Sequence, residues 1–205
     1  AINPPEKENF NKLATASEPL IKELVIQDPA IVNIPAMLSV SDTTLVVIPS
    51  NDQVFVSRII PVLNDMLKNY SVIVMGISDW EYYDNLETQY LHNLSVHIAS
   101  LNHLDYSGAG FTVIARIFYE KLKTYPDDYA IQGFDITYRF LKALMQYGTD
   151  FKDFIKGNEM KGVFTSYRFK QLGEGNGFEN NYVCIKKYQD FRLIKIYPVQ
   201  MTGGK

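Results

Sequence analysis

The sequence lacks several features that define whole classes of protein. It contains one cysteine, Cys184, so the chain cannot form an internal disulfide. No segment approaches the roughly 18 consecutive apolar residues that a membrane-spanning helix requires. With a net charge of −3, the chain also lacks the excess of lysine and arginine that a nucleic-acid surface needs. We therefore expect no internal disulfide, no transmembrane segment and no nucleic-acid partner.

The motifs of common active sites are absent too. The sequence has no G-x-S-x-G nucleophile turn, no H-E-x-x-H zinc motif and no phosphate-binding P-loop. His97, His103 and Asp105 are of types that bind metals, but their spacing matches no known zinc pattern, and surface or loop histidines are the simpler interpretation. We expect no metal, no cofactor and no catalytic activity, with a hydrolase or transferase kept as a third class of hypothesis.

One stretch combines acidic and aromatic side chains. Its acidic residues are Asp79, Glu81 and Asp84, and its aromatic residues are Trp80, Tyr82 and Tyr83. Paired carboxylates can perform acid and base catalysis, although the same pattern is typical of a solvated loop. The aromatic rings either stack on a ligand at the mouth of a cleft or pack the loop against a neighbouring helix. The sequence leaves these alternatives open.

The chain does contain the material of an ordinary globular protein. Hydrophobic residues make up 46% of it and charged residues 21%, which is ample for a core. Cys184 lies in an alternating stretch, which predicts a buried structural thiol. The opening, Ala1 to Pro5, lacks the charged start and apolar run of a signal peptide. The chain is thus either cytoplasmic or a processed or shortened piece of a longer protein, and its abrupt opening favours a shortened piece.

Two apolar runs predict neighbouring parallel strands. Leu45–Pro49 reads as a buried strand, a helix follows to about Asn69, and Ser71–Gly76 reads as the next strand. A strand, helix and strand of this length form the right-handed crossover of a parallel sheet. Ligands of open parallel sheets bind beyond the carboxyl ends of the strands. These ends are the polar turns Ser50–Asp52 and Ser78–Trp80, which makes the two turns the candidate site.

The helix after the first strand has a recognisable start. Ser50 followed by Gln53 matches the capping-box pattern, so Ser50 is expected to cap this helix. The alternative function of Ser50 and Asn51 is ligand contact, because free N–H groups at a helix N-terminus attract anions. Pro61 removes one backbone hydrogen bond inside the helix and predicts a kink.

The remaining elements alternate before the chain becomes rich in strands. We expect, in order, a helix in 4–19, a strand at 21–26, a short helix in 31–38, a strand at 95–100, helices at 111–123 and 130–147, and strands in 163–170 and 182–196. Gly148 is well placed to end the second long helix. Tyr188–Phe191 is expected to turn the last run into a hairpin, and Gly173–Gly177 to be a flexible turn. The alternation predicts an α/β fold with a doubly wound, mostly parallel sheet and a C-terminal β-rich segment.

Three stretches of sequence resemble a known family. Leu45–Asp52, followed by a helix and Val72–Gly76, resembles the second lobe of type I periplasmic binding proteins, the receptors for branched-chain amino acids and related solutes. Tyr129–Leu144 is similar to the late helix of that family, in which an aromatic residue, small residues and an aspartate precede an apolar face. Together with Ser78–Trp80, these residues resemble a divergent envelope branch, some members of which carry LysM peptidoglycan-binding domains. No LysM sequence is present here.

The resemblance covers residues 21–196 and implies two lobes, joined by crossovers, with the ligand between them. It implies an α/β lobe in residues 1–100, a crossover and two long helices from the other lobe in 101–162, and a β-rich tail returning to the first lobe in 163–205. Most of the other lobe would then be missing. The helices within 108–160 must therefore find another apolar surface, either their own sheet or a second copy of the chain.

The resemblance also implies a function. The ligand contacts carried over to this sequence are Ser50, Asn51, Asp52, Ser78, Asp79 and Trp80. The first hypothesis is a non-catalytic solute-binding module of the periplasm or cell envelope, which closes on a partner lobe around a small polar ligand such as an amino acid or a cell-wall fragment. The alternative is an envelope module that has lost its small ligand and binds a protein or glycan. A protein partner, a second lobe and oligomer formation all stay open.

Overall fold

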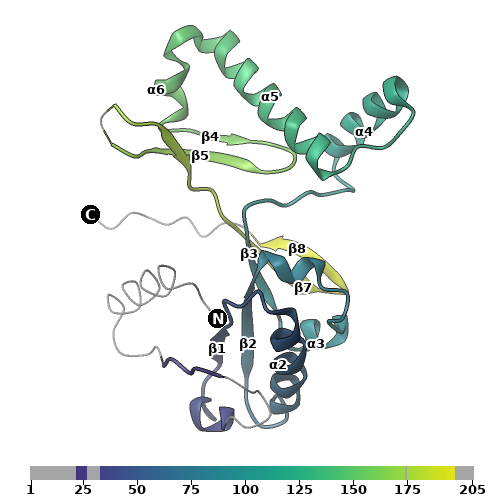
Figure 1. Ribbon diagram of the computed structural model, residues 1–205, viewed down its shortest axis with the longest axis vertical. Helices are drawn as coiled ribbons and strands as arrows, with labels where there is room; N and C mark the ends of the chain where they lie inside the picture. The colour runs from purple at the N-terminus through teal and green to yellow at the C-terminus, as the bar shows by residue number, and fades with distance from the viewer. Residues whose placement is uncertain (1–21, 27–32, 174, 197–205) are drawn as a thin grey trace. The chain divides into compact units, whose positions relative to one another are not determined.

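The computed structural model describes residues 22–26, 33–173 and 175–196 and divides the chain into two compact units (Figure 1). Unit 1 holds the described residues up to Ala99 together with Ile185–Ile196. Unit 2 runs from Ser100 to Cys184. Along the described residues, the chain passes from unit 1 to unit 2 after Ala99 and returns to unit 1 at Ile185.

Unit 1 is built on a five-stranded mixed sheet. Its strands, in spatial order, are β1 (Thr44–Val47), β2 (Val72–Ile77), β3 (His97–Ser100), β7 (Cys184–Gln189) and β8 (Arg192–Ile196). Strands β1, β2 and β3 are parallel, whereas β7 and β8 pair antiparallel. The Tyr188 N–H donates to the Val96 carbonyl and the Cys184 thiol to the Ser100 carbonyl, so β7 runs antiparallel to β3. The α/β fold is thus observed, with a sheet that contains parallel strands.

Helices connect the parallel strands of unit 1. They are α2 (Gln53–Met66) and α3 (Thr88–Asn93), with the short 3₁₀ helix η2 (Ser78–Tyr82), and a further 3₁₀ helix, η1 (Ile34–Met37), precedes β1. The N-cap of α2 is Asp52, whose carboxylate accepts the N–H groups of Val54 and Phe55 at 2.9 and 3.1 Å. The predicted Ser50 capping box is therefore wrong, because the carboxylate two residues later is closer to the first free N–H groups. The helix also ends at Met66, three residues before the expected Asn69.

The predictions for the start of the chain have mixed outcomes. The helix expected in 4–19 and the residue Ile21 lie outside the described residues. Residues 22–26 form no strand, so the strand predicted there is wrong. Its alternation was loose, and the apolar side chain of Val25 is exposed instead of facing a sheet partner. The short helix expected in 31–38 is present as η1.

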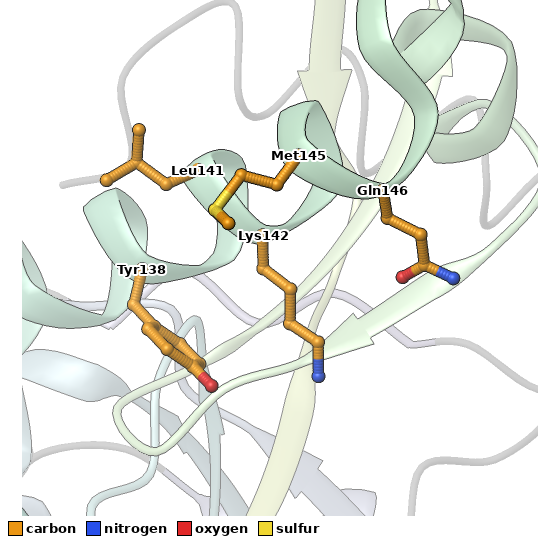
Figure 2. Close-up of a pocket in the computed structure, with 5 residues that line it drawn as sticks. All are labelled: Tyr138, Leu141, Lys142, Met145 and Gln146. Carbon is orange, nitrogen blue, oxygen red and sulfur yellow. The ribbon is translucent and has the colours of Figure 1, made fainter.

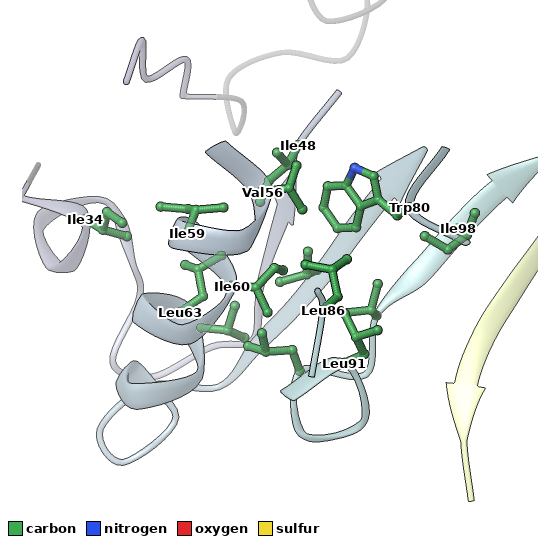
Figure 3. Close-up of a cluster of buried hydrophobic side chains, with 14 residues drawn as sticks. Ile34, Ile48, Val56, Ile59, Ile60, Leu63, Trp80, Leu86, Leu91 and Ile98 are labelled. Atoms are coloured by element: carbon green, nitrogen blue, oxygen red, sulfur yellow. The ribbon is translucent and has the colours of Figure 1, made fainter. Parts of the chain in front are cut away.

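The core of unit 1 lies where α2 packs on one face of the sheet (Figure 3). The buried side chains of α2 recur at helical spacing, as the sequence predicted: they are Val56, Ile59, Ile60 and Leu63. Strand β2 alternates between buried and half-buried residues along its six positions, with Val72 and Val74 directed into the core. The apolar faces of α2 and β2 thus pack against each other in one core.

The predicted hairpin at the end of the chain is confirmed. Strands β7 and β8 pair directly around Asp190 and Phe191, which both have a positive φ, +51° and +57°. Two such residues form the type I′ turn whose twist suits a two-residue hairpin. The Phe191 ring packs against His92 with ring centroids 4.6 Å apart, which holds this bulky residue in an unusual backbone conformation.

Unit 2 combines helices with a small antiparallel sheet. Its elements are α4 (Ala109–Leu122), α5 (Asp128–Tyr147), η3 (Gly148–Asp150), α6 (Phe151–Ile155), β4 (Glu159–Lys161), β5 (Ser166–Gln171) and β6 (Phe178–Asn180). Strand β5 pairs with β4 on one side and β6 on the other. Both predicted long helices are present, and Gly148 ends α5 with a positive φ of +57°. No helix among the described residues has the length and apolarity needed to cross a bilayer.

A buried carboxylate organises the interior of unit 2. Asp135 of α5 is fully buried and accepts the backbone N–H of Phe164 at 3.1 Å, in the turn between β4 and β5. The Arg139 Nε lies 3.5 Å from the other carboxylate oxygen. Gly162 approaches so closely that a Cβ there would overlap the Asp135 carboxylate. A charged side chain, a guanidinium and a glycine thus fix the turn beneath α5.

Tyr167 lies near this carboxylate with its hydroxyl buried and no hydrogen-bond partner among the described residues. Burial and the negative charge of Asp135 raise its pKa from 10.0 to about 12. The neutral phenol is therefore favoured in the folded state, and the stability it contributes falls as the pH rises above 10. At neutral pH the unpaired hydroxyl destabilises the folded state, because it has lost its hydrogen bonds to water and gained none in the protein.

Tyr167→Phe is expected to raise the free energy of unfolding at pH 7 by up to about 1 kcal/mol, since it removes an unpaired buried hydroxyl. Between pH 9 and pH 11 the wild type should lose about 1 kcal/mol more than the variant. Urea unfolding of both proteins at these pH values measures the two effects. A variant that loses as much stability as the wild type at pH 11 would contradict the assigned position of this hydroxyl.

Candidate functional site

The two candidate turns lie at the same edge of the unit 1 sheet. Strands β1 and β2 are parallel, with Val47 opposite Met75. The Ile48 N–H donates to the Met75 carbonyl at 2.8 Å, so the pairing continues to the point where both strands end. The parallel arrangement and the shared edge predicted from the sequence are therefore confirmed.

Three hydrogen bonds join the segments that follow the two strands. The Trp80 Nε1–H donates to the Ser50 carbonyl at 2.9 Å, and the Tyr83 hydroxyl donates to the Asn51 carbonyl at 2.7 Å. The Gln53 side-chain amide also donates to the Asn85 side chain at 2.8 Å. These bonds connect residues about thirty positions apart in sequence, which makes the two turns one structural unit. We call this unit the carboxyl edge: Ser50, Asn51, Asp52, Ser78, Asp79 and Trp80, with the neighbouring Tyr82 and Tyr83.

Trp80 belongs to the core rather than to the surface. Only 1% of its side chain is exposed, and its ring lies among the buried side chains of the unit 1 core (Figure 3). The ring lies against the backbone of Gly76 in β2, where any Cβ would overlap it. Of the two interpretations of the aromatic cluster, packing therefore describes Trp80, whose ring is not accessible to a ligand. Tyr82 is the exposed ring of the cluster, at 73%.

The polar groups of the carboxyl edge differ in whether they already make hydrogen bonds within the chain. The Ser50 hydroxyl oxygen accepts the Asp52 N–H at 3.2 Å, and the Asp52 carboxylate caps α2. The expected anion site at the N-terminus of α2 is thus filled by a carboxylate of the chain, and an added anion would meet like charge. The carboxylate of Asp79 is exposed and makes no hydrogen bond within the described ranges of the chain. The Asp79 carboxylate thus faces solvent at this edge.

Negative charge at the carboxyl edge influences the pKa of the Tyr83 hydroxyl. Burial raises the pKa of its hydroxyl above 10.0, and the carboxylates of Asp79 and Asp52 raise it further. Both carboxylates are therefore close enough to influence the same phenol. An edge with two carboxylates, a hydroxyl and an amide accepts hydrogen bonds more readily than it binds anions.

A buried ion pair supports the edge from the C-terminal hairpin. Lys186 of β7 is 4% exposed, and its Nζ lies 2.9 and 2.8 Å from the two carboxylate oxygens of Glu81, which is 18% exposed. Glu81 thus has a structural partner, which the acidic cluster of the sequence did not reveal. The alternation of β7 contained the signal, since Lys186 follows the buried Cys184 by two positions and so faces the same side.

The other candidate residues make contacts of their own within the chain. Among the residues the structure describes, no group of three or more His, Cys, Asp or Glu side chains is arranged to hold a metal ion. The His97 Nδ1 lies 2.6 Å from the Ser95 carbonyl. Hydrogen bonds from Ser107 lower the pKa of Asp105. Cys184 is buried, and its thiol donates to the carbonyls of Ser100 and Asn102 at 3.4 Å, as expected of a structural thiol.

Comparison with known proteins gives a limited similarity. No protein-family model and no curated protein matches the sequence. An ABC transporter substrate-binding protein from Desulfitobacterium hafniense in complex with Leu is 16% identical, with a TM-score of 0.37 over 66% of this chain and 39% of that one. A leucine-binding protein from Thermotoga maritima is 13% identical, with a TM-score of 0.40 over 92% of this chain and 54% of that one. The chain thus spans about half, or less, of the length of these solved structures, which are binding proteins of the class that the sequence resembles.

Gly76→Ala is expected to displace the Trp80 ring, because the new methyl group overlaps it. Overpacking of this kind costs about 1–3 kcal/mol. Trp80 is the single tryptophan of the chain, so a red-shifted fluorescence maximum reports the displacement directly. Gly133→Ala is the matched control, because a Cβ there meets no atom within 4 Å. Equal stability and emission in Gly76→Ala and the wild type would refute this packing.

Lys186→Met is expected to destabilise the protein by about 3–5 kcal/mol, because Glu81 is left partly buried without its cation. The double variant with Glu81→Leu should recover most of the loss, since no unpaired charge remains. Lys68→Met provides the control, because its ion pair with Asp65 is exposed and contributes less than about 1 kcal/mol. Chemical denaturation of the four proteins decides, and a double variant as unstable as Lys186→Met would be inconsistent with this account.

Proposed function

We propose that unit 1 is the ligand-binding lobe of a non-catalytic, extracytoplasmic solute-binding protein and that it recognises a small polar ligand at the carboxyl edge. The observation that carries the proposal is the hydrogen-bonded union of the two turns that follow the parallel strands β1 and β2. Such an edge is where open α/β sheets bind their ligands. The resemblance of Leu45–Asp52 and Val72–Gly76 to a receptor lobe supports the same role.

The chemistry of the edge favours a ligand that donates hydrogen bonds. Asp79 offers an exposed carboxylate, and Asp52 adds negative charge at the same edge. The Ser50 hydroxyl has a proton to donate, because its oxygen is the acceptor for the Asp52 N–H. An amino or hydroxyl group of the ligand would pair with Asp79, and a neutral oxygen with Ser50. Amino acids and amine-bearing cell-wall fragments carry such groups.

A single edge covers one side of a ligand. Solute-binding proteins bury most of the ligand surface, and hinged closure of a second lobe provides the remaining cover. Binding by the carboxyl edge therefore requires a partner lobe opposite it. The periplasm or the cell envelope is the compartment that suits this function.

Asp79→Ala in the full-length protein is expected to weaken ligand binding by roughly 10- to 100-fold, the effect of losing a hydrogen bond to a charged group. The ligand is first found by thermal-shift screening of the common amino acids and of wall-derived amino sugars and peptides. Titration calorimetry then compares the wild type with Asp79→Ala and Ser50→Ala. Asp65→Ala is the control, because Asp65 is an exposed aspartate near the far end of α2.

Two results would count against the proposal. One is the absence of any hit among these compounds at millimolar concentration. The other is a ligand whose affinity is the same in Asp79→Ala, Ser50→Ala and the wild type, because that ligand would bind elsewhere. If Asp65→Ala lost as much affinity as Asp79→Ala, the loss would come from the change in net charge and not from a contact between Asp79 and the ligand.

Tyr82 favours a second candidate function, the binding of a protein or glycan by an envelope module without a small ligand. An exposed tyrosine beside exposed carboxylates is a common element of a recognition surface. Tyr82→Ala tests this role better than a change at Trp80, which would disrupt the core. Reduced recovery of one envelope component by Tyr82→Ala, with unchanged small-ligand screening, would support the second function; equal recovery would remove it.

A further inference from the structure

Two hollows on the surface of the described residues differ in how they are enclosed. The hollow on α5 of unit 2 is lined by side chains of that helix alone, as Figure 2 shows: Tyr138, Leu141, Lys142, Met145 and Gln146. The hollow on unit 1 has two walls, one from α2 and one from the stretch that runs into α3. We call this second hollow the α2–α3 cleft, and its lining residues are Ser57, Ile60, Pro61, Asn85, Leu86, Glu87 and Tyr90.

Hydrogen bonds between side-chain amides tie the two walls of the α2–α3 cleft together at both ends. At one end, the Gln53 amide donates to the Asn85 side chain at 2.8 Å. At the other end, the Asn93 amide donates to the Asn64 side chain at 2.9 Å, and the Gln89 amide donates to Asn93 at 2.8 Å. In both walls, the residues that line the cleft lie at or between these ties. The chain itself therefore fixes the spacing of the walls, as is usual in a preformed binding site.

The α2–α3 cleft has an apolar floor and a small volume. Ile60 and Leu86 are 1% and 9% exposed and belong to the unit 1 core (Figure 3). The Pro61 ring and the half-buried Tyr90 ring add apolar surface. The volume is about 120 Å³, the space that about four water molecules occupy in the liquid. A chain of a few methylene groups fits this space, whereas pockets for larger ligands measure about 300 Å³ or more.

The polar groups of the cleft are mainly hydrogen-bond acceptors. Pro61 has no N–H to donate to the Ser57 carbonyl, one turn earlier in α2, so this carbonyl lacks its usual helical partner. The Ser57 hydroxyl donates to the Val54 carbonyl at 3.0 Å, which leaves its oxygen as an acceptor. Glu87 is the N-cap residue of α3, but its exposed carboxylate caps no N–H group. A positively charged ligand that donates hydrogen bonds therefore matches the cleft better than an anion.

We propose that the α2–α3 cleft binds an organic cation with a short apolar chain, the chemistry of a lysine or arginine side chain. The apolar chain lies on Ile60 and Leu86. The charged group pairs with the Glu87 carboxylate and donates a hydrogen bond to the Ser57 carbonyl, and the Tyr90 ring adds a cation–π contact. A free cation and a basic side chain of a partner polypeptide share this chemistry. The proposal does not depend on the function proposed for the carboxyl edge.

Titration of the full-length protein, followed by amide NMR, tests the proposal with n-butylammonium and ethylguanidinium as probes. Both cations should shift the signals of Ser57, Leu86 and Glu87 to saturation, with dissociation constants on the order of millimolar, because so small a ligand makes few contacts. The uncharged n-butanol should bind more weakly than n-butylammonium. Nα-Acetyl-lysine methylamide separates the two sources of the cation: binding as tight as that of n-butylammonium indicates a side chain of a polypeptide, and weaker binding indicates a free cation.

Two variants separate cation binding from stability. Glu87→Gln should weaken the binding of n-butylammonium by roughly two- to fivefold, the strength of an exposed ion pair. Glu120→Gln is the matched control, because Glu120 is an exposed glutamate of α4 in the other unit. Pro61→Ala supplies the N–H that the Ser57 carbonyl lacks, so it should weaken binding while the midpoint of thermal unfolding stays equal or rises. A loss of affinity in this variant therefore cannot come from unfolding.

Three results would each overturn the proposal. The first is the absence of saturable shifts at the lining residues with either cation. The second is n-butanol binding as tightly as n-butylammonium, because the charge would then play no part. The third is binding that Asp79→Ala abolishes and Glu87→Gln leaves unchanged, because the cation would then lie at the carboxyl edge. Shifts at the cleft that persist in Asp79→Ala support the cleft whether or not the carboxyl edge binds a ligand.

Discussion

The contact between the Trp80 ring and the backbone of Gly76 fixes the geometry of unit 1. The ring occupies space that a side chain on β2 would fill, and its N–H reaches the Ser50 carbonyl at the end of β1. One side chain thus links the core, the second strand and the turn of the first. Dispersion and this hydrogen bond, together with those made by Tyr83 and Gln53, set the positions of the polar groups around the ring, and the same arrangement buries the ring.

The C-terminal hairpin strengthens this arrangement through an ion pair. Lys186 brings a cation into the interior, where Glu81 of the segment after β2 meets it with both oxygens. A buried pair adds little net stability, since desolvation offsets most of the attraction, but it penalises any arrangement that separates the partners. Strand β7 comes a hundred residues after η2 in sequence. The pair therefore fixes the register of a late segment against an early one.

Local patterns predicted the elements of the fold better than they predicted the site. The apolar runs of β1 and β2, the helical spacing of α2 and the glycine after α5 each follow from neighbouring residues alone, and the structure agrees with them. The buried position of Trp80 and the pairing of Glu81 with Lys186 depend on contacts between distant segments. The alternation of β7 indicates that Lys186 faces inward, but not which residue it meets. The helix cap shows the limit at short range: Ser50 and Asp52 both fit a capping position, and three-dimensional proximity selects Asp52. The strand expected at 21–26 failed for the related reason that apolar residues without a sheet partner form no strand.

Burial of apolar side chains shapes both units, but it leaves polar groups exposed in one and apolar groups exposed in the other. In unit 1, apolar side chains of helix and strand meet, and the polar groups remain at the edge where the strands end. In unit 2, α5 carries more apolar surface than a three-stranded sheet can cover, so Leu141 and Met145 stay exposed. Exposed apolar side chains that lie together are unfavourable in water, and monomeric proteins seldom carry large patches of them. The polar groups at the strand ends of unit 1 and the apolar side chains on α5 of unit 2 are thus exposed for different physical reasons.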